Sequence, residues 1–153
     1  EKRRLQNITH RDVVKSRQHF LILHIPHTYQ KLIDNDILED HSMGYAAHTG
    51  FRAGTCTPYR FYDLDLESST DLIVHPFAMM EATLKYYMKL SPEESKTHIS
   101  ELVEKVKSVD GTFISLWHNE TLSNEGLWAG WRKVYEHLVE VAHVAKQKVE
   151  SQA

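Results

Sequence analysis

Histidine is the residue type that gives this sequence its main capacity for chemistry. The 153 residues include 11 histidines and a single cysteine, Cys56. One cysteine excludes an internal disulfide and a cysteine-based zinc site, so metal binding or proton transfer would depend on imidazole and carboxylate groups. Imidazole changes its charge near neutral pH, which makes histidine a common general acid or base.

His118 occupies the most informative position among the histidines. It follows residues 112–117, T-F-I-S-L-W, which have the composition of a buried strand. Ligands collect at the carboxyl ends of parallel strands in α/β folds, so His118 is a candidate for proton transfer. A histidine that only makes a structural hydrogen bond at a strand end explains the position equally well. The preceding Trp117 is the best candidate for an aromatic surface beneath a sugar ring.

Four other polar residues are candidates for the carboxyl ends of strands. They are Arg17, His19, Asp40 and Arg52. The two arginines could bind a carboxylate or a polar substrate through their forked donors, although an arginine is more often a solvated or structural partner. Asp40 and His41 could together act as metal ligands or as a general base. Asp and Ser before Gly44 are also common turn formers, and this turn interpretation is slightly favoured.

Several motifs point away from particular kinds of chemistry. His24 and His27 have a spacing that chelates metals on a helix, but Pro26 breaks the turn between them, so we expect no metal site there. Asp63 and Asp65 belong to an acidic cluster that we interpret as a solvated loop. The sequence has no nucleophile elbow, phosphate loop or dinucleotide fingerprint, which argues against nucleotide enzymes.

The composition is that of one globular domain over residues 1–153. The hydrophobic content of 41% is enough for a core, and the net charge of −3 includes no basic block that could follow a phosphate backbone. We therefore expect no nucleic-acid partner. The longest apolar stretches, such as 20–25, are far shorter than the roughly 20 residues that span a bilayer, so we expect no membrane span.

The hydrophobic pattern predicts strands that alternate with helices. Strand composition occurs at 13–23, 37–45, 50–62, 72–76 and 112–117, and helical spacing at 2–9, from Pro26, at 79–88, after Ser91 and from about Gly126. The helix after Ser91 begins with a capping box, S-P-E-E, and is the clearest of these predictions. Alternation without a tight hairpin signal predicts an α/β fold with a mostly parallel sheet and a long C-terminal helix.

Five blocks of sequence lie in order between Glu1 and Glu136. They read V-K-S-R-Q-H-F-L-I-L, P-H-T-Y-Q-K-L, D-H-S-M-G-Y-A, G-F-R-A-G-T-C-T-P-Y-R-F-Y-D-L and G-T-F-I-S-L-W-H-N. Together they resemble polysaccharide deacetylases with the nodulation-protein-B homology domain, which is similar to carbohydrate esterase family four. The likeness is strongest to bacterial members that carry S-M-G-Y and G-F-R-A-G-T.

The resemblance implies a distorted (β/α) barrel of which this chain is the C-terminal half. It places the catalytic aspartate and the metal-binding Asp-His-His triad before Glu1, so we expect no metal ligands on this chain and a divalent metal, zinc first, in the complete protein. Leu116-Trp117-His118 matches the family's last motif, which makes His118 the general acid. Arg17 matches an arginine that orients the catalytic aspartate, although Gln18 and His19 stand where the family has prolines.

The implied reaction is hydrolysis of an acetyl group on a glycan, at an amide bond that is not a peptide bond. Arg52 and Asp40 would line the substrate groove, with His19 and Trp117 as further contacts. Two other functions are compatible with the residues present. One is a sugar-binding relative that has lost catalysis. The other is an oligomerising structural domain, because half of a barrel leaves sheet edges unpaired and so favours homo-oligomers.

Overall fold

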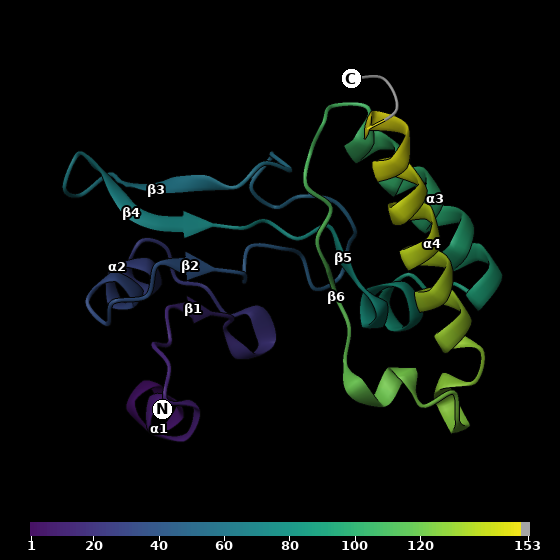
Figure 1. The fold of residues 1–153 in the computed structure, drawn as a ribbon, viewed down its shortest axis with the longest axis horizontal. Coiled ribbons are helices and arrows are strands. Elements are labelled where there is room, and N and C mark those ends of the chain that lie inside the picture. Colours follow the sequence, from purple (N-terminus) through teal and green to yellow (C-terminus); the bar gives the residue numbers. More distant parts are fainter. Residues whose placement is uncertain (151–153) are drawn as a thin grey trace.

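The structure is a computed structural model that describes the backbone of residues 1–150 and the side chains of residues 1–143. In chain order its elements are α1 (Lys2–Thr9), β1 (Lys15–Ser16), η1 (His19–Leu21), α2 (His27–Ile33), β2 (Glu39–Asp40), β3 (Tyr59–Asp63), β4 (Ser68–Val74), β5 (Met79–Met80), η2 (Thr83–Tyr87), α3 (Pro92–Lys107), β6 (Ser115–Leu116), η3 (Asn119–Leu122), η4 (Gly126–Trp128) and α4 (Trp131–Glu150). Figure 1 shows a sheet with α1 and α2 in one region and the pair α3 and α4 in another.

The larger sheet has four strands in the order β1-β2-β4-β3. Strands β1, β2 and β4 are parallel, and β3 pairs antiparallel with β4. The smaller sheet is the parallel pair β5 and β6. The structure thus confirms an α/β arrangement with a mostly parallel sheet and a long C-terminal helix.

The hairpin between β3 and β4 was not predicted. Its turn has no Asn-Gly signal and is instead held by the Asp63 side chain, whose Oδ1 accepts hydrogen bonds from the backbone N–H groups of Asp65 at 2.9 Å and Leu66 at 3.3 Å. An aspartate that binds backbone amides two and three residues later is a common turn former. The acidic cluster is therefore a hairpin turn in which Asp63 itself is buried.

Helix α2 covers one face of the four-stranded sheet. It begins after Pro26, as expected, and buries Tyr29 against Phe61, with ring centroids 4.9 Å apart in an edge-to-face arrangement. The buried residues of this cluster are Tyr29, Ile37, Met43, Phe61, Leu72 and Val74. Leu72 and Val74 lie two positions apart in β4, so they define the face that α2 covers.

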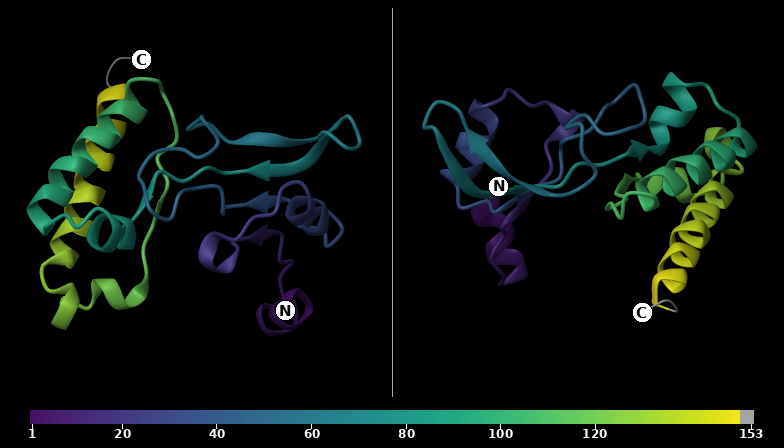
Figure 2. Two further views of the ribbon diagram at one scale, coloured as in Figure 1. Left: turned by 180° about the vertical axis from the view of Figure 1, so that it is seen from behind. Right: turned by 90° about the horizontal axis from the view of Figure 1, so that it is seen from above.

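Helices α3 and α4 pack together over β5 and β6, away from the larger sheet (Figure 2). The predicted capping box is present at the start of α3: Ser91 Oγ accepts from the Glu94 N–H at 3.3 Å, and the Glu94 carboxylate accepts from the Ser91 N–H at 2.8 Å. The buried residues of this second cluster are Ala78, Met79, Leu84, Ile99, Val103, Trp131, Val134 and Leu138. Within the part of the chain that the structure describes, no helix is long and apolar enough to cross a membrane.

Several strands are shorter than predicted. The expected strand over 13–23 ends at Ser16, because the chain then turns into η1, where Phe20 and Leu21 have φ angles of 55° and 56°. The expected strand over 112–117 is reduced to Ser115–Leu116. The predicted helix over 79–88 is wrong at its start, since Met79–Met80 pairs with β6 and only the segment after it is helical, including the π-helix η2.

Candidate functional site

A pocket of about 570 Å³ lies where three strands end. Strands β1, β5 and β6 end at Ser16, Met80 and Leu116, and the segments that follow them supply much of the pocket lining. Its polar side chains are Arg17, Gln18, His19 and His118, and its walls include Phe20, Leu21, Met80, Tyr86, Tyr87 and Leu116. The position agrees with the rule that sites in α/β folds form at the carboxyl ends of parallel strands.

His118 is bound to a buried carboxylate, that of Glu81. The Nδ1 atom of His118 lies 2.6 Å from Glu81 Oε1, and the backbone N–H of His118 donates to the same oxygen at 2.9 Å. The Glu81 side chain is fully buried, whereas that of His118 is half exposed. An ionised carboxylate can only accept a hydrogen bond, so Nδ1 carries a proton and Nε2 is the nitrogen left for other partners.

The parallel pairing of β5 and β6 places these two residues together. Met80 is paired with Leu116, so Glu81 and His118 both follow the same end of the two-stranded sheet. The carbonyl of His118 accepts from the Thr121 N–H at 3.1 Å and from Thr121 Oγ1 at 2.7 Å, which fixes the backbone as it enters η3. His118 is therefore held at its ring nitrogen Nδ1, at its backbone N–H and at its carbonyl.

Arg17 and His19 enter the pocket from the segment after β1. The Nε of Arg17 donates to the carbonyl of His41 at 3.1 Å, and the N–H of Gln18 donates to Ser42 Oγ at 2.8 Å, so this segment is tied to the loop after β2. Desolvation lowers the pKa of Arg17 below its ordinary value, and the negative charge of Asp40 acts in the opposite direction. The guanidinium nevertheless stays charged in any working pH range.

The structure brings together three of the residues predicted for the site, because Arg17, His19 and His118 all line the pocket. The ring of His19 stacks on that of Phe20, with centroids 4.2 Å apart and planes at 22°. Phe20 is held at a positive φ, a conformation that non-glycine residues adopt rarely and often near functional sites.

Asp40, Arg52 and Trp117 do not line this pocket. Asp40 is fully buried on the α2 side of the sheet, where its carboxylate accepts from Tyr29 Oη at 3.3 Å, from the Ser42 N–H at 2.9 Å and from Ser42 Oγ at 2.7 Å. Burial first, and then the charge of Asp40, raise the pKa of Tyr29. A carboxylate placed this way stabilises the loop after β2 and is not accessible to a glycan.

Arg52 and Trp117 have other surroundings. Arg52 is exposed in the loop that precedes β3. Trp117 is partly buried and packs edge-to-face on Tyr135 of α4, with ring centroids 5.2 Å apart. Trp117 packs against the core formed by α3 and α4, and its role as a sugar platform stays a prediction.

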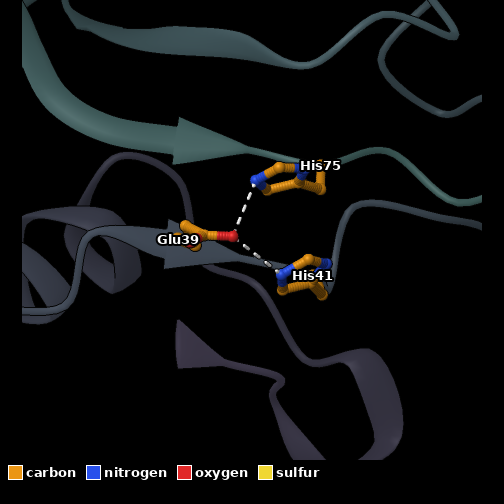
Figure 3. A group of neighbouring side chains, drawn as sticks. All are labelled: Glu39, His41 and His75. Carbon is orange, nitrogen blue, oxygen red and sulfur yellow. Dashed lines mark ion pairs between the residues drawn. The ribbon is translucent and has the colours of Figure 1, made fainter. Parts of the chain in front are cut away.

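A second group of polar side chains lies on the larger sheet (Figure 3). Oε2 of Glu39 is 3.1 Å from Nε2 of His75 and 3.5 Å from Nε2 of His41. The two imidazole rings are stacked, with centroids 4.4 Å apart and planes at 12°. Lys15 Nζ lies 3.0 Å from the same oxygen, and its hydrogen bond is the main cause that lowers the pKa of Glu39. Desolvation is the main cause that lowers the pKa of His41.

Sequence reasoning did not identify Glu81, Glu39 or His75 as site residues. A signal for Glu81 was present, because it is the one charged residue in the apolar stretch 77–84, and a lone carboxylate there is rarely buried without a partner. Glu39 and His75 are 36 residues apart in the sequence. They meet only through the register of β2 and β4, which no local pattern reveals.

The pocket residues do not themselves form a metal site. Nδ1 of His118 is occupied by Glu81, and Arg17 has no lone pair to offer a cation. Among the described residues, Glu39, His41 and His75 are the one group of three or more potential metal ligands. The pocket residues therefore do not provide the ligands for the metal that the family resemblance implies.

Comparisons with models of known protein families, with curated proteins and with solved structures found no match to this chain. The resemblance to polysaccharide deacetylases therefore depends on the sequence blocks quoted above. The barrel fold and the deacetylase activity that it implies are therefore proposals.

Proposed function

We propose that this chain carries the general-acid side of a polysaccharide deacetylase site, in which acetyl groups are removed from a glycan by metal-dependent hydrolysis. The observation that carries the proposal is the His118–Glu81 pair at a pocket that also contains Arg17 and His19. A histidine at the end of a parallel strand, held by a buried carboxylate, has the position and the support that proton transfer requires.

His118 protonates the leaving amine or alkoxide as the acyl bond breaks. Nδ1 is bound to Glu81, so the proton is delivered from Nε2. The negative charge of Glu81 stabilises the imidazolium form that donates this proton, in the way that a buried aspartate supports the histidine of a hydrolase triad. Glu81 is thus a positioning residue that acts through His118.

Arg17 orients the carboxylate that acts as base. Its bond to the His41 carbonyl uses Nε, and the terminal nitrogens of a guanidinium are suited to bind a carboxylate in a fork. The carboxylate itself is expected before Glu1. In the complete protein a divalent metal, zinc by the family resemblance, would supply Lewis-acid activation of the acetyl carbonyl and of a water molecule, and the residues that would hold it are expected before Glu1.

The pocket walls suit a sugar that carries an acetyl group. Phe20, Tyr86 and Tyr87 offer aromatic surface, and Met80 and Leu116 are apolar neighbours of His118. Aromatic rings pack against the apolar faces of sugars and leave the hydroxyl groups to polar partners. His19 directly precedes Phe20 in the sequence, and its ring stacks on that of Phe20, so it is a polar partner beside this aromatic surface.

The proposed architecture of the complete domain is a distorted (β/α) barrel. The parallel strands β1, β2 and β4, with α2 packed on one face, support this proposal, as does the parallel pair β5 and β6. In such a barrel the carboxyl ends of these strands would share one rim with the catalytic residues.

The direct test is the variant His118→Ala in a protein that includes the segment before Glu1. We expect acetate release from acetylated oligosaccharides to fall by at least about a hundredfold, because general-acid catalysis contributes that much, while metal content is unchanged. Near-normal turnover would remove His118 from the mechanism. Glycan binding without acetate release by the unaltered protein would favour the sugar-binding alternative.

A further inference from the structure

The parallel register of β2 and β4 places Glu39, His41 and His75 on one face of the larger sheet. Asp40 is paired with Val74, and the His75 N–H donates to the Asp40 carbonyl at 2.8 Å, so His41 and His75 are the next neighbours along the two strands. Glu39 is two residues before His41 and shares its face. This face is opposite the one that α2 covers.

The donor atoms of these residues have the separations of a metal site. A tetrahedral ion with metal–ligand bonds of about 2.0–2.1 Å keeps its ligand atoms about 3.3–3.4 Å apart. The two imidazole nitrogens lie 3.1 and 3.5 Å from one carboxylate oxygen, and all three atoms are within 4.8 Å of one another. The separations between the donor atoms therefore suit an ion, although one of the two stacked rings has to turn before both can bind it.

One of the nitrogens also needs a partner. Nε2 of His75 is a buried atom that makes no hydrogen bond to the described residues, although Glu39 Oε2 lies 3.1 Å away. A buried polar atom without a partner costs free energy, and metal coordination would satisfy it. The side chains of all three residues are between 20% and 23% exposed, so the cluster lies close to the protein surface.

We infer that Glu39, His41 and His75 form a binding site for a divalent transition metal, with zinc as the expected ion. Two imidazoles and one carboxylate are a donor set that zinc uses, and three protein ligands leave a fourth position for water. The inference concerns only these side chains and does not depend on the proposed deacetylase function. It departs from the expectation that this chain carries no metal ligands.

Two features of this cluster oppose metal binding, and the first of them can be tested by mutation. Lys15 holds the same carboxylate oxygen at 3.0 Å, but its side chain is 63% exposed and can leave into solvent. The two rings are almost parallel, and a metal lies near the plane of each ring that binds it, so one ring must turn when the ion enters. Because Lys15 and the ion would compete for the same oxygen of Glu39, removal of the Lys15 charge should strengthen metal binding.

The test is calorimetric titration of the chain with Zn²⁺, supported by the visible absorption of bound Co²⁺. We expect one saturable site whose affinity falls by a hundredfold or so in Glu39→Gln and in His75→Ala, since loss of a ligand exceeds the 10–100-fold effect of losing its support. Lys15→Met should bind more tightly than the unaltered chain. The matched control is the double variant His24→Ala and His27→Ala, which should bind as the unaltered chain does.

Two results would overturn the inference. One is the absence of saturable binding, and the other is an affinity that Glu39→Gln leaves unchanged, which would place the ion elsewhere. If His75→Ala does not fold, as judged by circular dichroism, the isosteric Glu39→Gln and the exposed Lys15→Met decide the question. Opposite effects of these two variants support the site, and equal affinities contradict it.

Discussion

The buried carboxylate of Glu81 determines how His118 can act. Because Oε1 accepts both Nδ1–H and the backbone N–H of His118, the imidazole has one tautomer and one orientation. The charge is also fully buried, so it interacts with the imidazole through little water. At the scale of single residues, the candidate site is therefore a pair, in which the Glu81 carboxylate holds the His118 imidazole in place.

Replacement of Glu81 by Gln tests this support. The amide keeps the size of the side chain but loses its charge, so it stabilises the imidazolium less. We expect acetate release to fall by about 10–100-fold, the usual effect of losing a supporting partner, with little change in KM. Glu120→Gln, an exposed position in η3, is the matched control. A Glu81→Gln variant with unaltered turnover and a normal circular dichroism spectrum would show that His118 works without this carboxylate.

Single residues differ in how far the sequence predicts them. Arg17, His19 and His118 were expected at a site as candidates for the carboxyl ends of strands, and all three line the pocket. Asp40 is the last residue of β2, but alternation along this strand turns its side chain toward α2, where it is buried. Glu81 stands out in the sequence as the lone charge of an apolar stretch, but its contact with His118 follows only from the pairing of β5 and β6.

Among the secondary-structure elements, helix α3 has the best-defined start. Ser91 and Glu94 form the capping box, and Pro92 occupies the first helical position. Ser91→Ala removes the side-chain acceptor for a helix N–H, so we expect a loss of about 1 kcal/mol in the free energy of unfolding by urea. Ser69→Ala, on the exposed part of β4, should change it by less than about 0.5 kcal/mol.

The effect of Ser91→Ala should also depend on pH. The hydrogen bonds from Ser91 lower the pKa of Glu94 below its ordinary value of 4.5. A depressed carboxyl pKa adds stability above that ordinary value, and this stability is lost as the pH falls through the lowered pKa. The difference between the unaltered chain and Ser91→Ala should be constant near neutral pH and shrink in acid. A difference that grows in acid would contradict the capping role of Glu94.

Helices were easier to predict than strands for a physical reason. The amphipathic spacing and the cap of α3 are local, so the sequence contains most of what determines the helix. The strands β1, β2, β5 and β6 have two residues each, and their pairing depends on distant neighbours. Met79 and Met80 are an example. Two apolar residues are compatible with a helix or a strand, and the pairing with β6 makes them a strand.

At the scale of the whole molecule, the chain has two hydrophobic clusters and an open sheet. The edge strands of the larger sheet are β1 and β3, and exposed apolar side chains include Phe20 at 79%, Leu64 at 74% and Leu66 at 69%. Unpaired edges of this kind favour association with a second chain. The mostly parallel sheet was predicted from the alternation of elements, whereas the β3–β4 hairpin was not.

We expect the chain to self-associate in solution through these edges. Sedimentation velocity should show a weight-average mass that rises with protein concentration above 17.8 kDa. Tyr62→Lys places a charge on the exposed edge strand β3 and should reduce this association, because lysine on an edge opposes pairing. A single monomeric species over the accessible concentration range would contradict the expectation.

The general-acid role of His118 is the central claim, and a comparison of two substrates tests it most directly. His118→Ala and the unaltered sequence, both with the segment before Glu1, are assayed on an N-acetylated oligosaccharide and on 4-nitrophenyl acetate. An amine must be protonated to leave, whereas 4-nitrophenolate leaves without help. We predict a loss of about a hundredfold or more on the amide and of less than about tenfold on the ester. Equal losses on the two substrates would contradict the account.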